Sequence, residues 1–133
     1  MTKRRPNVTV KLILKVGNEI LILKEDRTFT FPGGRVEWNE RVKETLKREL
    51  KEEIDYIPEK EPVLFDFWDQ LPENGKGHYV MIYFALCLEK KPKIKALEGA
   101  EILWLTKGEF KEKEIIRDSK FLEKIFKLEG LYK

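Results

Sequence analysis

Residues 31–56 read FPGGRVEWNERVKETLKRELKEEIDY, and this stretch determines the part of the fold that carries chemistry. Its first four residues contain proline and two glycines, which predict a loop. From Glu40 to about Ile54 an apolar residue recurs every fourth position, at Val42, Leu46, Leu50 and Ile54, as on one face of an α-helix. We expect Asn39 to cap the N-terminus of this helix.

Two glutamates of the predicted helix face the protein rather than water. At about 100° per residue, Glu53 falls within the apolar stripe and Glu49 lies at its edge, one turn away. Glu52 lies next to both. Carboxylates that are buried together repel each other unless a cation lies between them. The alternative is an ordinary acidic surface helix, and the inward position of Glu53 argues against it. An all-oxygen site of this kind suits Mg²⁺ or Mn²⁺.

The loop before the helix favours a phosphate-bearing ligand. The paired glycines Gly33 and Gly34 let the backbone approach a ligand or a metal closely. A glycine-containing loop that leads into a helix N-terminus also favours phosphate. Arg48, beside Glu49, can hold a carboxylate or a phosphate with two hydrogen bonds. Together these residues predict metal-assisted phosphoryl chemistry.

The chain resembles the Nudix hydrolases in this region. The spacing of the Nudix box, G-x5-E-x7-R-E-U-x-E-E-x-G-U, is matched by Gly34, Glu40, Arg48, Glu49, Leu50, Glu52 and Glu53. The resemblance extends to the residues before the box and to Glu101–Trp104, which is similar to the last strand of the family. Two positions differ, because Asp55 replaces the second glycine and Tyr56 replaces an aliphatic residue. Asp tolerates left-handed backbone better than most residues, so we expect the turn to survive.

The resemblance implies an α/β fold, a Nudix-type α/β/α sandwich with a mixed β-sheet between helices. It also implies Mg²⁺- or Mn²⁺-dependent hydrolysis of a nucleoside diphosphate linked to another group, by attack of water on a bridging pyrophosphate phosphorus. Glu49 and Glu53 would be the principal metal ligands, assisted by Glu52 and the Gly33 carbonyl, and Arg48 would orient Glu49. The general base stays open between Glu52 and Glu98. Gly34, Glu40 and Leu50 would be structural.

The substrate is less sharply predicted. The chain is similar to small MutT-like and ADP-ribose pyrophosphatase-like members, and the candidates are a (d)NTP or a nucleoside diphosphate sugar such as ADP-ribose. Pro72, sixteen residues beyond the box, matches the spacing of the ADP-ribose type. Candidate substrate-binding residues are Arg35, Trp68 and His78. Trp68 can stack on a base, although packing under a helix is the commoner role of such a residue. For Trp38 and Phe29 core packing is also favoured over lining a pocket.

The rest of the sequence predicts strands on both sides of the helix. The expected strands are Val8–Val16, Ile20–Lys24, Thr28–Phe31, Val63–Gln70, Tyr79–Leu88 and Ile102–Leu105. Pro32 and the glycines stop the third strand, and residues 72–77 form a loop. Tyr79–Leu88 is apolar on both faces, as in a central strand. Strict alternation in Val63–Gln70 places Phe65 and Phe67 on one face and Trp68 on the other. A helical turn at Lys107–Phe110 and an amphipathic helix at Ser119–Leu128 complete the pattern.

Composition limits the classes of function. The 133 residues are 41% hydrophobic, enough for one domain over residues 1–133. Charged residues make up 38% but nearly cancel to +3, and the basic cluster at 3–5 lies in a flexible N-terminal segment, 1–6. We therefore expect no stable nucleic-acid partner. The Lys and Glu bias is typical of proteins from hot environments.

One cysteine, Cys87, excludes an intramolecular disulfide and any metal site built from several cysteines. No apolar run is long enough to span a membrane, so we expect a soluble, cytoplasmic protein that acts on a small-molecule nucleotide. Homodimers are frequent among proteins similar to this one. The alternative function is a catalytically silent Nudix-fold module that binds or senses nucleotides. Such modules usually lose a box carboxylate, and this chain keeps Glu49, Glu52 and Glu53.

Overall fold

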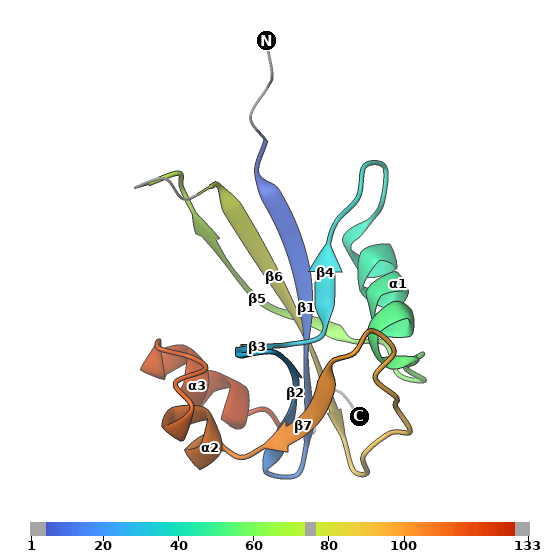
Figure 1. The fold of residues 1–133 in the computed structure, drawn as a ribbon, viewed down its shortest axis with the longest axis vertical. Coiled ribbons are helices and arrows are strands. Elements are labelled where there is room, and N and C mark those ends of the chain that lie inside the picture. Colours follow the sequence, from blue (N-terminus) through green and yellow to red (C-terminus); the bar gives the residue numbers. More distant parts are fainter. Residues whose placement is uncertain (1–4, 74–76, 130–133) are drawn as a thin grey trace.

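A computed structural model describes residues 5–73 and 77–129, and it has helices on both faces of a mixed β-sheet (Figure 1). Residues 1–4 of the basic N-terminal segment and residues 74–76 of the predicted loop lie outside the described residues. The elements are β1 (Asn7–Val16), β2 (Glu19–Glu25), β3 (Thr28–Thr30), β4 (Gly33–Arg35), α1 (Val42–Ile54), β5 (Val63–Gln70), β6 (Tyr79–Leu88), β7 (Glu101–Leu105), α2 (Lys107–Glu112) and α3 (Ser119–Phe126).

Strand β1 organises the sheet. It pairs in parallel with β6 along its whole length and antiparallel with β4 and β2 at its two ends. Strand β6 carries β5 on its outer side, while β2 carries β3 and β7. The predicted central position of Tyr79–Leu88 is thus confirmed. The expected α/β/α sandwich with a mixed sheet is confirmed as well, with α1 on one face and α2 and α3 on the other.

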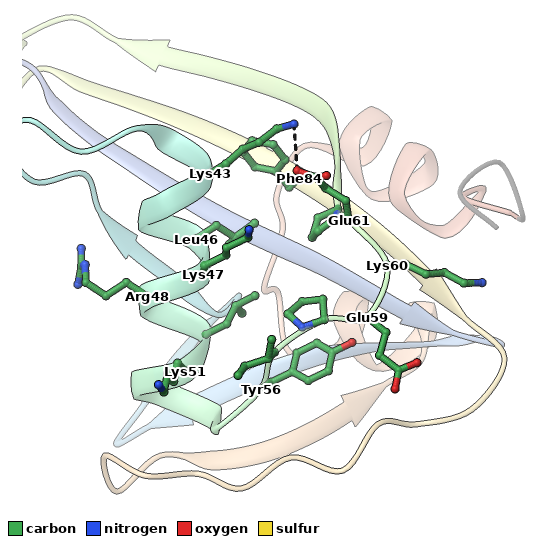
Figure 2. A pocket seen from close by; sticks show the side chains of 14 residues that line it. Lys43, Leu46, Lys47, Arg48, Lys51, Tyr56, Glu59, Lys60, Glu61 and Phe84 are labelled. Atoms are coloured by element: carbon green, nitrogen blue, oxygen red, sulfur yellow. Dashed lines mark ion pairs between the residues drawn. The ribbon is translucent and has the colours of Figure 1, made fainter.

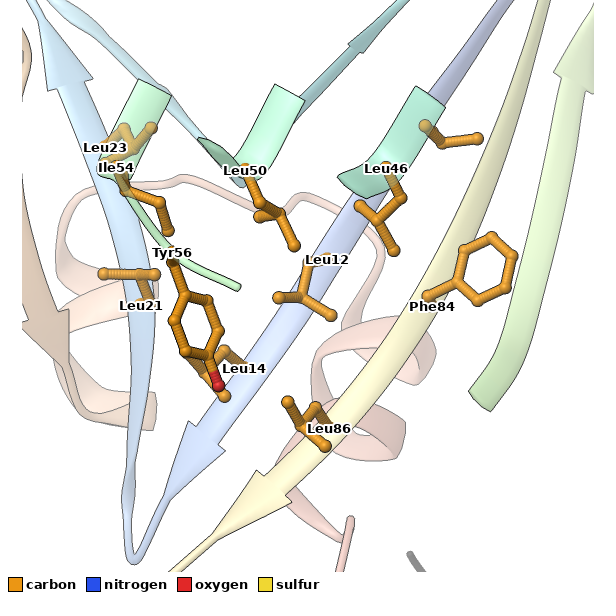
Figure 3. Packing of buried hydrophobic residues seen from close by; sticks show 11 residues of the cluster. Leu12, Leu14, Leu21, Leu23, Leu46, Leu50, Ile54, Tyr56, Phe84 and Leu86 are labelled. Carbon is orange, nitrogen blue, oxygen red and sulfur yellow. The ribbon is translucent and has the colours of Figure 1, made fainter. Parts of the chain in front are cut away.

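The alternation of β1 divides the core between the two faces of the sheet. Val10, Leu12 and Leu14 point towards α1 and pack with Leu46, Leu50 and Ile54, the apolar stripe read from the sequence (Figure 3). Ile13 faces the opposite layer, whose fully buried members include Phe110 and Ile125. Burial of each such side chain contributes on the order of 2 kcal/mol. Helix α1 is therefore fixed to the sheet by packing, which also fixes the direction of its other faces.

The two ends of α3 are held by polar contacts. The Asp118 carboxylate accepts hydrogen bonds from the backbone N–H groups of Lys120 and Phe121, as an N-cap. At the other end the buried Lys15 ammonium donates to the carbonyls of Phe126 and Leu128, at 2.9 and 2.6 Å. A cation at a helix C-terminus is favourable because the last carbonyls lack partners within the helix.

Among the described residues no helix is both long and apolar enough to span a membrane.

The N-terminus of α1 differs from the prediction. The helix begins at Val42 rather than Glu40, and its N-cap residue, Arg41, makes no side-chain cap hydrogen bond. Asn39 is not the cap, because it adopts a left-handed backbone conformation with φ of 65° in the preceding turn. The Glu40 carboxylate instead accepts a hydrogen bond from the Glu37 N–H at 3.2 Å and organises this turn. The C-terminus is as predicted, with Asp55 left-handed at φ 52°.

Two further predictions about local structure need correction. The third strand ends before Pro32, as predicted, but Gly33 and Gly34 are not loop residues, because they form β4 with Arg35 and pair with β1. The prediction that Trp38 packs in the core also fails, since its side chain is 87% exposed. The left-handed turn at Asn39 carries residue 38 outward, where the Arg5 guanidinium lies 5.4 Å from the ring centroid. The Trp38 ring is therefore in contact with the Arg5 cation at the surface instead of packing in the core.

Strand β5 contains an irregularity that alternation alone did not predict. The register with β6 shifts between Leu64 and Asp66, which inserts Phe65 as an extra residue. A bulge moves the following residues by one step relative to the two faces. Phe65 packs against Phe121 of α3, whereas Phe67 lies on the opposite face and is 67% exposed. The two phenylalanines therefore do not share a face.

Candidate active site

The inward glutamate of α1 lies against the glycine strand. Glu53 is half-buried, and its Oε1 accepts a hydrogen bond from the Gly33 N–H at 2.7 Å. Burial raises the pKa of the Glu53 carboxyl to about 7, the nearby charges of Glu49 and Glu98 add to this rise, and the Gly33 hydrogen bond and the Lys11 charge oppose it. The site therefore concentrates negative charge where solvent screens it poorly. A cation is the natural partner for that charge.

Both glycines of β4 are needed for the close approach of α1. Gly33 has φ of 142°, and a Cβ at this position would overlap the Val10 carbonyl of β1. A Cβ at Gly34 would overlap the Glu49 carboxyl group. Gly33 thus allows β4 to pair with β1, and Gly34 allows α1 to bring Glu49 against the strand, because neither residue has a side chain. The double glycine of the sequence is explained by these two contacts.

Arg48 connects the acidic residues of the box. Its Nε donates to Glu40 at 2.8 Å, its Nη1 donates to Glu49 at 2.9 Å, and its Nη2 donates to the Arg35 carbonyl at 3.2 Å. The Arg48 hydrogen bond and a 2.6 Å hydrogen bond from the buried Thr45 hydroxyl lower the pKa of Glu40 to about 2. The hydrogen bonds to Glu40 and Glu49 in turn raise the pKa of Arg48. Because the planar guanidinium fixes the directions of its donors, Arg48 holds Glu49 in one orientation.

The two candidate bases lie on either side of the buried pair. Glu52 is half-exposed, and its Oε2 lies 3.4 Å from Nη1 of Arg48. Glu98 belongs to the segment before β7, which docks on the end of α1 through two backbone hydrogen bonds of 2.9 Å, from Lys95 N–H to the Ile54 carbonyl and from Leu97 N–H to the Glu53 carbonyl. This docking brings Glu98 close enough for its charge to raise the pKa of both Glu49 and Glu53.

The donor set fits a hard divalent cation. Within residues 5–73 and 77–129, no three carboxyl, imidazole or thiol groups form a preassembled metal cluster. Glu49 and Glu53 each use only Oε1 in a hydrogen bond, with Arg48 and Gly33 respectively, which leaves both Oε2 atoms without a hydrogen bond to any described residue. Burial raises the pKa of Glu49 as well as that of Glu53. Carboxylate oxygens in a like-charged, partly desolvated pair are the ligands that Mg²⁺ and Mn²⁺ prefer.

A cleft of about 680 Å³ opens between the sheet and the first turn of α3. Its lining is largely aromatic and includes Phe29, Phe31, Trp68, Tyr83 and Phe121. The Trp68 indole N–H donates to the Tyr83 hydroxyl at 3.0 Å, which fixes the orientation of the ring, and 43% of the Trp68 side chain stays exposed. This volume and lining are typical of a site for a nucleotide-sized ligand.

The structure separates the three predicted substrate-binding residues. Trp68 lines the aromatic cleft. Arg35 and His78 lie instead at the beginning of β1, where Asn7 accepts a hydrogen bond from Arg35 and donates one to the His78 carbonyl. The cleft also contains Lys11, which sequence reasoning missed. Its signal was a lysine within the apolar run Val8–Val16, at the point where β1 pairs with Gly33.

A second cavity, of about 440 Å³, lies between α1 and residues 56–62 (Figure 2). Its floor is apolar, with Leu46, Leu50 and Phe84, and lysines surround its mouth. Lys43 forms an ion pair of 3.3 Å with Glu61 there. Neither Glu49 nor Glu53 lines this cavity, because both carboxylates lie against the glycine strand β4.

Comparisons with known proteins agree with this geometry. The profile of the NUDIX domain matches residues 3–125. The chain is 32% identical over 123 residues to an ADP-ribose pyrophosphatase of Methanocaldococcus jannaschii, covering 85% of this chain and 72% of that protein. Its fold is similar to that of the MutT protein of Methanosarcina mazei Go1, with a TM-score of 0.72, 19% identity and coverage of 94% and 96% of the two chains. A mutator MutT protein of Bacillus halodurans also gives a TM-score of 0.72, with 24% identity and coverage of 92% and 83%. The buried glutamate pair, its arginine and its double glycine thus lie in a chain that belongs to the Nudix family of hydrolases.

Proposed function

We propose that the protein is a divalent-metal-dependent pyrophosphohydrolase that cleaves a nucleoside diphosphate linked to a second group, with ADP-ribose as its first candidate substrate. The observation that carries this proposal is the position of two partly buried carboxylates, Glu49 and Glu53, against the glycine strand β4, which pairs with β1 at Lys11, a residue that lines an aromatic cleft of nucleotide size. The identity of 32% to an ADP-ribose pyrophosphatase supports the choice of substrate. A (d)NTP is the second candidate, since the fold is also that of MutT proteins.

The acidic residues of α1 would hold Mg²⁺ or Mn²⁺. Glu49 and Glu53 supply the buried oxygens, and Glu52 and the Gly33 carbonyl are the further ligands that the Nudix box implies. When bound, the ion offsets the charge that develops on the pyrophosphate oxygens and orients the attacking water. Arg48 is a positioning residue, because it holds Glu49 through its side chain and Gly34 leaves room for that carboxylate.

The proton of the attacking water goes to a carboxylate beside this pair. Glu52 and Glu98 are the two candidates, and both are exposed enough to exchange the proton with solvent afterwards. General bases work best when a water molecule can lie within hydrogen-bond distance of them and of the reacting phosphorus. Stacking of the base on Trp68 and Phe29 in the cleft would leave the pyrophosphate to extend towards Gly33, against which Glu53 lies.

A substrate panel with product identification tests the proposal. The purified protein is incubated with Mg²⁺ and (d)NTPs, ADP-ribose, other sugar nucleotides and dinucleoside polyphosphates in ¹⁸O water, and mass spectrometry identifies the product that carries the label. We expect release of a nucleoside monophosphate, with ADP-ribose among the best substrates. Glu53→Gln should reduce turnover by orders of magnitude, whereas Glu44→Gln, on the exposed side of the first turn, should not.

Two results would contradict the proposal. Absence of hydrolysis across the whole panel would exclude the pyrophosphohydrolase. Nucleotide-induced thermal stabilisation without turnover would favour the silent binding or sensor module instead.

A further inference from the structure

A lysine lies between two fully buried apolar residues of strand β1. Lys11 lies between Val10 and Leu12, both fully buried, and its own side chain is half-buried in the aromatic cleft. Removing an ammonium group from water is costly unless an anion compensates for it. A methionine or leucine would fill this position at no such cost. The charge at Lys11 therefore requires a partner.

The partner is not another residue of the described chain. Lys11 is the register partner of Gly33, whose N–H binds Glu53, so the lysine lies beside the glutamate site. Burial lowers the pKa of Lys11, and the charges of Glu53, Glu49 and Glu25 oppose this only in part, through space and without a hydrogen bond. A cation held near carboxylates, yet not bonded to them, remains free to bind an anion that enters the cleft.

The cleft is lined by aromatic rings together with a few charged side chains, Lys11, Asp66, Arg117 and Asp118. Trp68 and Phe29 provide an apolar part for a base, and Lys11 is the cation where the cleft reaches the glycine strand. The other cleft-lining cation, Arg117, is exposed at the beginning of α3, beside Asp118. A pyrophosphate that approaches Glu49, Glu53 and Glu98 experiences their repulsion. A cation between the base and the glutamates offsets that repulsion for the phosphate nearest to the nucleoside.

We propose that the Lys11 ammonium binds the phosphate attached to the nucleoside, and so sets the position of the pyrophosphate between the cleft and the glutamate site. This inference rests on the proposed function, which it deepens by assigning a phosphate contact to a residue outside the Nudix box. Lys11 accordingly selects for substrates in which the pyrophosphate directly follows the nucleoside. It also fixes the phosphate nearest to the nucleoside relative to the attacked bond.

Binding of a nucleotide and of its nucleoside separates the phosphate contact from packing. AMP, GMP, adenosine and guanosine are titrated into the wild type and into Lys11→Met without metal, with chemical-shift changes as the readout. We expect Lys11→Met to weaken binding of the monophosphates about 10-fold or more and to change nucleoside binding less than about twofold. Lys11→Arg should restore most of the monophosphate affinity. Lys93→Met, which removes an exposed lysine of the segment before β7, is the matched control.

Equal losses for the nucleotide and the nucleoside would overturn the inference, because they would show a role in packing. No loss for AMP and GMP, or no binding of either by the wild type, would overturn it as well. Steady-state kinetics at saturating Mg²⁺ provide the second readout, in which Lys11→Met should raise KM about 10-fold or more and change kcat less. If Lys11 only compensated for the negative charge of the glutamates, Lys11→Met would change the dependence of the rate on Mg²⁺ concentration and leave KM for the nucleotide unaltered.

These measurements distinguish the two proposals. If the wild type hydrolyses nothing, the proposed function fails, while the nucleotide and nucleoside titrations still report on Lys11. If the wild type hydrolyses a substrate but Lys11→Met keeps the wild-type KM, only the inference about Lys11 fails.

Discussion

Replacing Glu53 by glutamine should make the metal-free protein more stable in alkaline solution. The carboxyl and the amide have nearly the same size, and the amide oxygen can still accept the hydrogen bond from the Gly33 N–H. The substitution therefore removes a buried negative charge near Glu49 and Glu98 and little else. If the same variant also loses activity, as proposed above, Glu53 is a residue that is retained for function at a cost in stability.

The size of the effect follows from the pKa of Glu53. The rise from 4.5 to about 7 is worth on the order of 3 kcal/mol for a fully buried group, and solvent on the open side of the half-buried carboxyl reduces this to about 1–2 kcal/mol. A pKa that is higher in the folded state stabilises the fold below the unfolded value, near 4.5, and this stability is lost as pH rises through 7. The amide of Glu53→Gln does not titrate, so this variant does not lose stability in this way as pH rises.

Urea unfolding between pH 4.5 and 8.5 in the presence of EDTA measures the difference between the two proteins. The stability of Glu53→Gln relative to the wild type should increase by about 1–2 kcal/mol over this interval. Glu44→Gln, on the exposed side of the same helix, should run parallel to the wild type. Saturating Mg²⁺ should stabilise the wild type at pH 8 and leave Glu53→Gln nearly unchanged. Parallel pH profiles for Glu53→Gln and the wild type would refute the reasoning, because they would show that Glu53 is not destabilised by burial.

Three other substitutions test the packing around the site. Gly34→Ala should displace Glu49 and lower activity about 10- to 100-fold in the substrate assay, while Gly108→Ala, whose Cβ meets only an ordinary contact, should keep full activity. Arg48→Lys keeps the charge but not the fixed fork of donors, so kcat should fall about 10-fold or more and the Mg²⁺ concentration for half-maximal rate should rise; wild-type values for both would disprove the positioning role. Phe110→Ala should cost about 3–5 kcal/mol in denaturant unfolding because the ring is fully buried, and Phe67→Ala, on an exposed face, should cost less than about 1 kcal/mol; similar losses would contradict the assignment of the two faces of the sheet.

Helix α1 was predictable because its information is local. The four-residue spacing of Val42, Leu46, Leu50 and Ile54 sets the buried face, and the same period sets the direction of Glu53. The left-handed end at Asp55 was predictable for the same reason. The helix start was not, because the contacts of the Glu40 carboxylate with Thr45 and Arg48 replace a conventional cap.

The errors in β5 and at Trp38 have a tertiary origin. Alternation assumes an uninterrupted strand, and a bulge such as the one at Phe65 forms where packing against α3 is better served by an extra residue. Trp38 was expected in the core because it is apolar, yet its direction depends on a turn whose left-handed residue is Asn39. Neither the bulge in β5 nor the left-handed turn at Asn39 is indicated by the periodicity of apolar residues in the sequence.

The sequence by itself determined the family, the buried face of α1 and the identity of the acidic residues, because spacing along one helix and a motif of fixed length are both local properties. The tertiary structure alone decided which distant groups meet that helix. It brought Glu98 to the end of α1 through two backbone hydrogen bonds, placed Lys11 opposite Gly33, and formed the aromatic cleft from β3, β5, β6 and the start of α3. Such contacts depend on strand pairing and on the docking of segments far apart in the chain. These are set by the free energy of the whole core rather than by any single stretch.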